Sequence, residues 1–141
     1  MAGYSGKPLV DKLGIRVGET VVALNRPENY ADLLGKLPDG ASLSQRAGNA
    51  AEFLHLFVIR RDQLEKQLRS LRPKLADTGI LWISWPKKAA RIATDVSEGV
   101  IRDIALPLGL VDTKVCAVDE TWSGLKLMVR RENRAPKISK K

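Results

Sequence analysis

Two apolar segments separated by an amphipathic one place the strongest constraint on the fold of this chain. FLHLFVI at residues 53–59 and ILWISW at residues 80–85 are continuous apolar runs. Runs of this length are too short for typical helices and suit strands that are buried on both faces. Between them, leucines recur on one helical face at Leu64, Leu68, Leu71 and Leu75. A strand, an amphipathic helix and a second strand in this order predict a parallel pair joined by a right-handed crossover.

The same alternation extends through the rest of the chain. Short apolar runs predict two more parallel strands, and two apolar stretches around a polar loop predict a terminal antiparallel pair; these segments are residues 20–24, 41–45 and 111–131. Helical spacing predicts four helices within residues 7–14, 30–37, 60–75 and 95–108. The spacing of Asp62 with Glu65, and of Asp95 with Glu98, is that of a capping box and predicts where the two longer helices begin.

Length and cysteine usage favour one domain in a reducing compartment. The chain of 141 residues is the usual size of a single domain. Cys116 is the only cysteine, so no internal disulfide forms, and no cluster of Cys and His predicts a metal site. The first residues lack a signal-peptide pattern, and no apolar run is long enough to span a membrane. We therefore expect a soluble, cytoplasmic protein that does not bind membranes.

Most of the positive charge lies near the C-terminus. The formal net charge is +8, and residues 126–141 hold seven basic residues and one acidic residue, which leaves +2 for the rest. This distribution predicts a single domain at residues 1–131 and a basic, disordered tail at residues 132–141. Such a tail contacts nucleic acid or other polyanions without specificity. A basic accessory protein that associates with nucleic acid is accordingly one alternative for the function.

Several sequence segments resemble known families. The pieces GYSGKPLVDKLG, WPKKA, TD and KVCAVDETWSGL resemble a family of small bacterial proteins defined only as a domain of unknown function. The run from Phe53 to Trp85, which includes LRPKLADTG, and the terminal pair at residues 112–131 resemble class I S-adenosylmethionine-dependent methyltransferases. The second resemblance implies a three-layer, Rossmann-like α/β fold. Its mostly parallel sheet has strand order 2-1-3-4-6-5, with the last strand antiparallel.

The chain departs from the methyltransferase pattern where the cofactor binds in that family. The resemblance implies a glycine-rich turn after the first strand, but here that strand opens into Asn25, Arg26, Pro27 and Glu28. Pro27 has no amide to donate. The resemblance also implies an acidic residue after the second strand, and SLSQRAGN contains none. These departures argue against S-adenosylmethionine as the cofactor. They favour a binding module or an enzyme of unassigned chemistry, with a divergent methyltransferase as the alternative.

The carboxyl ends of the predicted parallel strands carry a set of mostly basic residues. Ligands of open parallel sheets bind beyond these strand ends. The candidates there are Asn25, Arg26, Arg60, Arg61, Trp85, Lys87, Lys88, Thr94 and Asp95. Arg and Lys side chains close to a helix N-terminus attract phosphate or carboxylate. We therefore hypothesise a small anionic ligand at this edge; the alternative is that these charges are merely solvated turn residues and that Trp85 closes the core.

Three further groups of residues have a structural and a chemical interpretation. Asp119, Trp122 and Ser123 fall in the terminal loop, where they form either a polar rim of the site or an ordinary turn. His55, the only histidine, lies inside an apolar strand, which favours a hydrogen-bonded interior imidazole over a catalytic base. Cys116 also lies in an apolar strand, which favours a packed thiol over a nucleophile.

Overall fold

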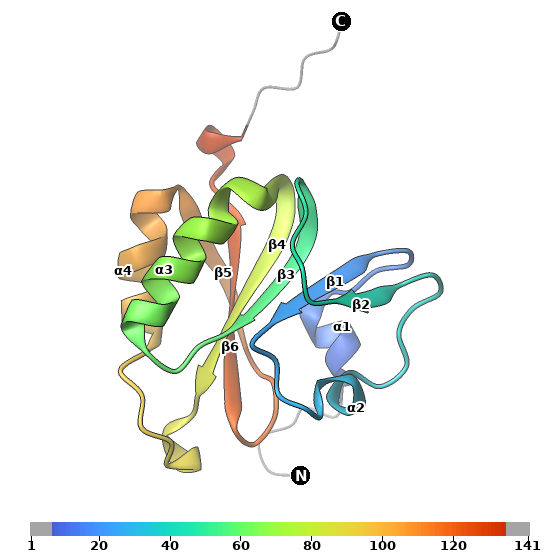
Figure 1. Cartoon of the computed structure of the whole chain (residues 1–141), viewed down its shortest axis with the longest axis horizontal. Coiled ribbons are helices and arrows are strands. Elements are labelled where there is room, and N and C mark those ends of the chain that lie inside the picture. The colour runs from blue at the N-terminus through green and yellow to red at the C-terminus, as the bar shows by residue number, and fades with distance from the viewer. Residues whose placement is uncertain (1–6, 135–141) are drawn as a thin grey trace, which may run out of the picture.

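Six strands form one twisted sheet in the order β2-β1-β3-β4-β6-β5 (Figure 1). The computed structural model describes residues 7–134. The strands are β1 (Thr20–Leu24), β2 (Ser42–Ser44), β3 (Ala51–Phe57), β4 (Leu75–Pro86), β5 (Leu110–Ala117) and β6 (Trp122–Val129). β2, β1, β3 and β4 are parallel, and β6 is antiparallel to both of its neighbours. The predicted strand order and the antiparallel sixth strand are confirmed.

Helices cover both faces of the sheet, as the alternation in the sequence predicts. They are α1 (Leu9–Leu13), α2 (Tyr30–Leu34), α3 (Arg61–Leu71) and α4 (Glu98–Ala105), with short 3₁₀ helices at η1 (Arg72–Lys74), η2 (Lys88–Ala90), η3 (Leu106–Leu108) and η4 (Arg131–Asn133). In Figure 1, α3 and α4 lie together over one end of the sheet and α1 and α2 lie near β1 and β2. The predicted tail at residues 132–141 lies outside the described residues from 135 onward.

Two hydrophobic cores are separated by the sheet. On the side of α3 and α4, leucines of α3 and isoleucines of α4 pack on β3, β4 and β6; the fully buried members of this cluster include Leu54, Leu64, Leu68, Ile101 and Leu127. On the other side, α1 and α2 pack on a second cluster that includes Leu13, Tyr30, Phe53 and Trp82. The indole Nε1–H of Trp82 donates to the carbonyl of Leu13 at 2.9 Å, which fixes the end of α1 against the sheet.

Both capping boxes that the sequence predicts are wrong. α3 begins at Arg61, and the Gln63 Oε1 atom accepts the backbone N–H groups of Ile59 at 3.0 Å and Arg60 at 3.5 Å. α4 begins at Glu98 with Ser97 as its N-cap, and the Ser97 Oγ atom accepts the N–H of Val100 at 3.3 Å. The two aspartates accept other amides than predicted: Asp62 Oδ1 accepts the N–H of Gln63 at 2.7 Å, and Asp95 Oδ1 accepts that of Arg61 at 2.6 Å.

The β3–β4 region is longer at its start than the apolar pattern predicts. β4 begins at Leu75, directly after η1, and its register with β3 shifts between Ala51 and Phe53. Gly79 lies at this shift: a Cβ atom there would be 2.8 Å from the carbonyl oxygen of Ala51. Only glycine allows the two backbones to approach this closely. β4 is twelve residues long and lies between β3 and β6.

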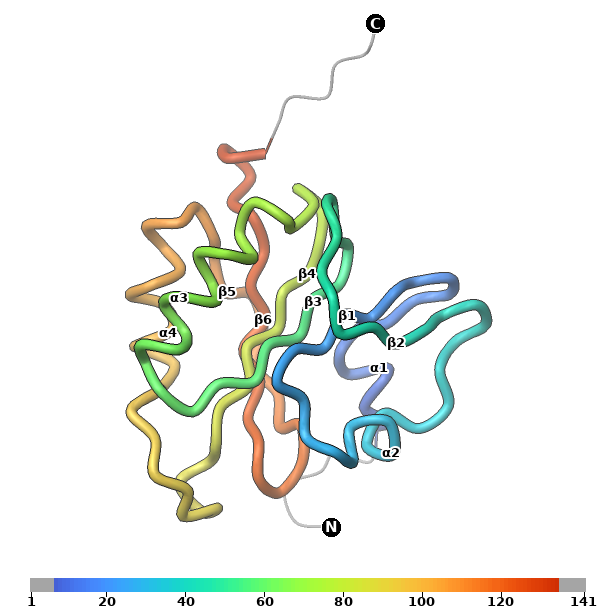
Figure 2. Tube along the Cα trace, in the orientation of Figure 1, coloured from blue at the N-terminus to red at the C-terminus, as the bar shows by residue number. Residues whose placement is uncertain are grey.

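The connection from β2 to β3 contains no helix. β2 and β3 lie on opposite sides of β1, so residues 45–50 must carry the chain past β1. Figure 2 shows this segment as a plain tube that rises beside β3 before the chain turns back into the sheet. Parallel neighbours are usually joined through a helix that covers the sheet face. Here the face beside α3 stays open next to β1.

Candidate functional site

A pocket lies at the carboxyl end of β4, where the chain leaves the sheet for α4. Its volume is about 680 Å³. β4 contributes its last two residues, the following loop contributes most of the wall, and β6 contributes one residue; together they are Trp85, Pro86, Lys87, Lys88, Ile92, Ala93, Thr94, Asp95, Val96, Ser97 and Ser123. Six of these are among the predicted site residues: Trp85, Lys87, Lys88, Thr94, Asp95 and Ser123. The sequence analysis missed Ser97 and Ile92.

The loop that forms the wall is held in place by hydrogen bonds to distant parts of the chain. The Asp95 carboxylate accepts the backbone N–H of Arg61 at 2.6 Å. The Thr94 hydroxyl donates to the carbonyl of Ile59, and its oxygen accepts the N–H of Val96 at 3.1 Å. At the other end, the N–H of Lys87 donates to the carbonyl of Thr121 at 2.8 Å. The turn after β3 and the β5–β6 loop therefore set the shape of the pocket.

The charges around the pocket favour an anion. Lys87 is half-buried and Lys88 is exposed, and both line the pocket together with Ser97, the N-cap residue of α4. Asp95 is the one acidic residue in the lining, and one of its oxygens already accepts the amide of Arg61. The N-terminus of a helix carries partial positive charge, which adds to that of the lysines. Trp85 is only 8 % exposed, so its indole belongs mainly to the core.

Asn25 and Arg26 lie at the ends of β1 and β2, away from this pocket. Asn25 has a φ of +58° and its Nδ2 donates to the carbonyl of Phe57 at 3.0 Å and to Gln67 Oε1 at 2.8 Å. Arg26 Nη1 donates to the carbonyl of Ser44 at 3.4 Å. The hollow between these residues has a volume of about 330 Å³. The side chains of Asn25 and Arg26 therefore connect the ends of neighbouring strands.

Arg60 and Arg61 direct their guanidinium groups toward the first turns of α3. Arg60 pairs with Asp62 at 3.0 Å, and Arg61 pairs with Glu65 at 3.7 Å. Neither residue lines the β4 pocket. The Arg60 partner explains why the pKa of Asp62 is lowered, since the guanidinium donates a hydrogen bond to that carboxylate. The structure thus brings Lys87 and Lys88 together at one pocket, without the four candidates Asn25, Arg26, Arg60 and Arg61.

The β5–β6 loop is organised as a turn. Asp119 Oδ1 accepts the backbone N–H groups of Thr121 and Trp122, both at 2.8 Å. The indole of Trp122 packs edge-on against Phe57 with ring centroids 5.0 Å apart. Asp119 lines a different cavity, between α1, α2 and this loop, with a volume of about 680 Å³. Of the three loop candidates, only Ser123 reaches the β4 pocket.

His55 occupies the centre of the sheet in a buried hydrogen-bond network. Its Nδ1 lies 2.8 Å from the Tyr30 hydroxyl, and its Nε2 lies 2.7 Å from the Ser84 hydroxyl. His55 and Ser84 are fully buried and Tyr30 is 1 % exposed. Burial lowers the pKa of His55 to about 3. The imidazole is therefore neutral near pH 7, as an interior histidine should be, and burial likewise raises the pKa of the Cys116 thiol.

Comparison with known proteins identifies the fold. No protein family and no curated protein matches the chain. Among solved structures, a SAM-dependent methyltransferase from Aquifex aeolicus matches with a TM-score of 0.59 and 14 % identity, over 86 % of this chain and 87 % of that one. A putative type 11 methyltransferase from Sulfolobus solfataricus matches with a TM-score of 0.56 and 12 % identity, over 84 % and 89 %.

A third structure, LepI in complex with SAM, matches with a TM-score of 0.54 and 13 % identity, over 88 % of this chain and 47 % of that one. Together with the strand order, these matches show that the chain has a methyltransferase-like α/β fold.

Within residues 7–134, no helix is both long and apolar enough to cross a membrane. The same residues hold no group of three or more His, Cys, Asp or Glu side chains placed to bind a metal ion.

Proposed function

We propose that the chain binds a small anionic ligand in the β4 pocket. The observation that carries this proposal is the convergence of Lys87, Lys88 and the N-terminus of α4 on one hollow of about 680 Å³. Pockets of this size hold small metabolites, and charge-assisted hydrogen bonds from lysine suit phosphate or carboxylate. The Asp95 and Thr94 bonds hold the wall before any ligand arrives, so little ordering is needed on binding.

The methyltransferase-like fold implies that S-adenosylmethionine would bind at the end of β1, but the residues there do not fit it. Asn25 occupies the left-handed conformation that glycine would adopt more easily, and its side chain closes the space toward Phe57 and Gln67. The hollow there is lined by Ala23, Leu24, Asn25, Arg26 and Gln45 and contains no acidic residue. Each feature weakens the contacts that a ribose and a charged amino acid would need. Our proposal therefore includes no methyl transfer.

Calorimetric titration with adenosine 5′-monophosphate and with inorganic phosphate tests the proposal. We expect binding of the phosphate-bearing probes and none of uncharged adenosine. Lys87→Ala should weaken the binding about tenfold, because a charge-assisted contact is lost. Lys36→Ala is the matched control, since Lys36 is an exposed lysine outside the lining. Equal affinities of the two variants would contradict the proposal.

A divergent methyltransferase is the second candidate, and the fold matches favour it. A ligand that binds only the folded state raises the melting temperature by mass action. On our proposal, S-adenosylmethionine and S-adenosylhomocysteine leave the melting temperature unchanged at millimolar concentration. A concentration-dependent rise of the melting temperature with either compound would support the second candidate instead.

A further inference from the structure

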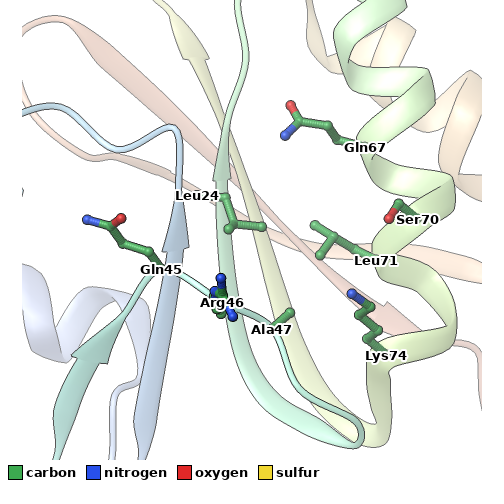
Figure 3. A pocket seen from close by; sticks show the side chains of 8 residues that line it. All are labelled: Leu24, Gln45, Arg46, Ala47, Gln67, Ser70, Leu71 and Lys74. Carbon is green, nitrogen blue, oxygen red and sulfur yellow. The ribbon is translucent and has the colours of Figure 1, made fainter.

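A second hollow lies on the face of the sheet beside α3 and shares no residue with the β4 pocket. It has a volume of about 460 Å³ and exists because the β2–β3 connection lacks a covering helix. Figure 3 shows side chains of α3 and η1 on one side and of the segment after β2 on the other, with Leu24 between them. We call this hollow the α3 groove; its lining is Leu24, Gln45, Arg46, Ala47, Gln67, Ser70, Leu71 and Lys74.

Every polar side chain in the lining of the α3 groove can donate a hydrogen bond, and none of the lining residues is acidic. Arg46 reaches it from the segment after β2 and Lys74 from η1 (Figure 3). None of the ion pairs found within residues 7–134 includes Arg46 or Lys74. Two cations that take part in none of these ion pairs keep their charge available for an external anion.

Gln67 adds a donor whose orientation is set by the protein. Its Oε1 accepts the side-chain amide of Asn25 at 2.8 Å. Asn25 is in turn held by the carbonyl of Phe57. With its oxygen engaged in this way, the Gln67 side chain is left with its NH₂ group for a ligand, and that group can only donate. The hydroxyl of Ser70, one turn along α3, adds another donor to the lining.

The floor of the α3 groove is aliphatic. Leu71 is 5 % exposed and belongs to the core beside α3, and Leu24 and Ala47 pack against the same core. No aromatic side chain lines the groove, so it offers no surface for stacking a planar base. An aliphatic body of a few carbons can cover this floor and gain hydrophobic contact in proportion to its area.

We infer that the α3 groove binds a small aliphatic anion, with its carboxylate or phosphate between Arg46 and Lys74 and its carbon chain on Leu24 and Leu71. Both halves of the groove are needed for this selectivity: the cations exclude neutral chains and the floor favours chains over inorganic anions. The site does not depend on the β4 pocket, because the two linings have no residue in common.

Titration of the isotope-labelled full chain with hexanoate, followed by amide chemical shifts at low salt, tests this inference. We expect saturable shifts at Ser70 and Lys74, and these shifts should persist in the Lys87→Ala variant, because Lys87 lines the β4 pocket and not the α3 groove. Hexanol, which has the chain without the charge, should bind at least about tenfold more weakly. Hexyl phosphate in a parallel titration identifies which head group is preferred. Shifts confined to the β4 pocket, or equal affinity for hexanol, would overturn the inference.

Variants separate the groove from a general attraction of anions to a basic protein. Lys74→Gln and Arg46→Ala should each weaken hexanoate binding about five- to tenfold. Lys66→Gln is the matched control, because Lys66 is an exposed lysine of α3 outside the lining, and it should bind like the wild type. Ser70→Phe keeps both cations but fills the hollow from an exposed position, and should abolish binding without a loss of melting temperature. Unimpaired binding by Ser70→Phe would refute the site.

Discussion

The most tightly specified residues of this protein are polar ones in the middle of its core. His55 on β3 bridges Tyr30 of α2 and Ser84 of β4, so one imidazole joins three elements. A buried polar side chain without partners costs free energy, but either tautomer of a neutral imidazole satisfies both hydroxyls. Among the described residues, no buried side-chain nitrogen or oxygen atom lacks a partner. The network therefore stabilises a specific packing of α2 on the sheet.

This network predicts how stability depends on pH. The pKa of His55 falls from 6.5 to about 3 on folding because burial disfavours the charged ring. Between these values the unfolded state binds a proton that the folded state does not, so the free energy of unfolding falls as the pH falls, by up to about 1.4 kcal/mol per pH unit. The stabilisation is complete above pH 6.5. Urea unfolding at pH 7, 6, 5 and 4 measures this slope.

The matched variant His55→Gln isolates the contribution of the histidine from that of the carboxylates. Glutamine does not titrate, but its amide retains one donor group and one acceptor. Its free energy of unfolding should be lower than the wild-type value at pH 7, and the difference should shrink as the pH falls toward 4. A constant difference across the series would show that His55 is not the titrating group.

A single hydrogen-to-methyl change is predicted to have opposite effects at two glycines. At Gly79 the added Cβ would lie 2.8 Å from both the Ala51 carbonyl oxygen and the Leu75 side chain, so Gly79→Ala should lower the free energy of unfolding by about 1–3 kcal/mol. In α4, Gly99→Ala meets only Ser97 Oγ at 3.8 Å and should raise that free energy by about 0.5 kcal/mol. Thermal and urea unfolding of both variants tests the contrast.

At the scale of elements, the helices were predictable in place but not in their capping. The spacing of Leu64, Leu68 and Leu71 predicts α3, and all three residues are buried. The start of α4 was misassigned because the Asp95 carboxylate binds the amide of Arg61, which is 34 residues away in sequence. Local spacing carries no information about such a contact, since it forms only when the turn after β3 meets the loop after β4.

The cap that replaces Asp95 leads to a prediction for α4. Ser97→Ala removes the acceptor of the Val100 amide and should lower the free energy of unfolding by about 1 kcal/mol. Ser97→Asn retains a capping oxygen and should recover most of this loss. Chemical unfolding of both variants provides the measurement. Equal destabilisation by alanine and asparagine would mean that the hydroxyl acts through the β4 pocket wall rather than as a cap.

For the whole molecule, the parallel sheet followed from the alternation of strands and helices and its strand order from the resemblance to methyltransferases, whereas the site followed only partly. Parallel strands bring their carboxyl ends to one edge, and this placed Trp85, Lys87 and Thr94 correctly near one another. It did not reveal that Arg60 is engaged by Asp62, because an ion pair depends on side-chain direction. The α3 groove was also beyond prediction, since it arises from a helix that the β2–β3 connection does not contain.

The unequal lengths of the elements predict that the sheet opens from one edge. β2 has three residues and pairs only with β1, and α1 and α2 have five residues each, while β4 has twelve and lies between β3 and β6. Short elements with one neighbour open locally at low cost. In hydrogen exchange, β2 amides should therefore exchange at least about a hundredfold faster than β4 amides.

A core substitution beside α3 then distinguishes local opening of β2 from global unfolding. Leu64 is fully buried between α3 and the sheet, and Leu64→Ala should lower the free energy of unfolding by about 2–5 kcal/mol. If β4 exchanges only by global unfolding, the exchange rates of its amides should rise by the factor that corresponds to this loss of unfolding free energy. The β2 amides, which exchange through local opening, should keep their rates. Equal acceleration of both strands would mean that the sheet unfolds as a single unit.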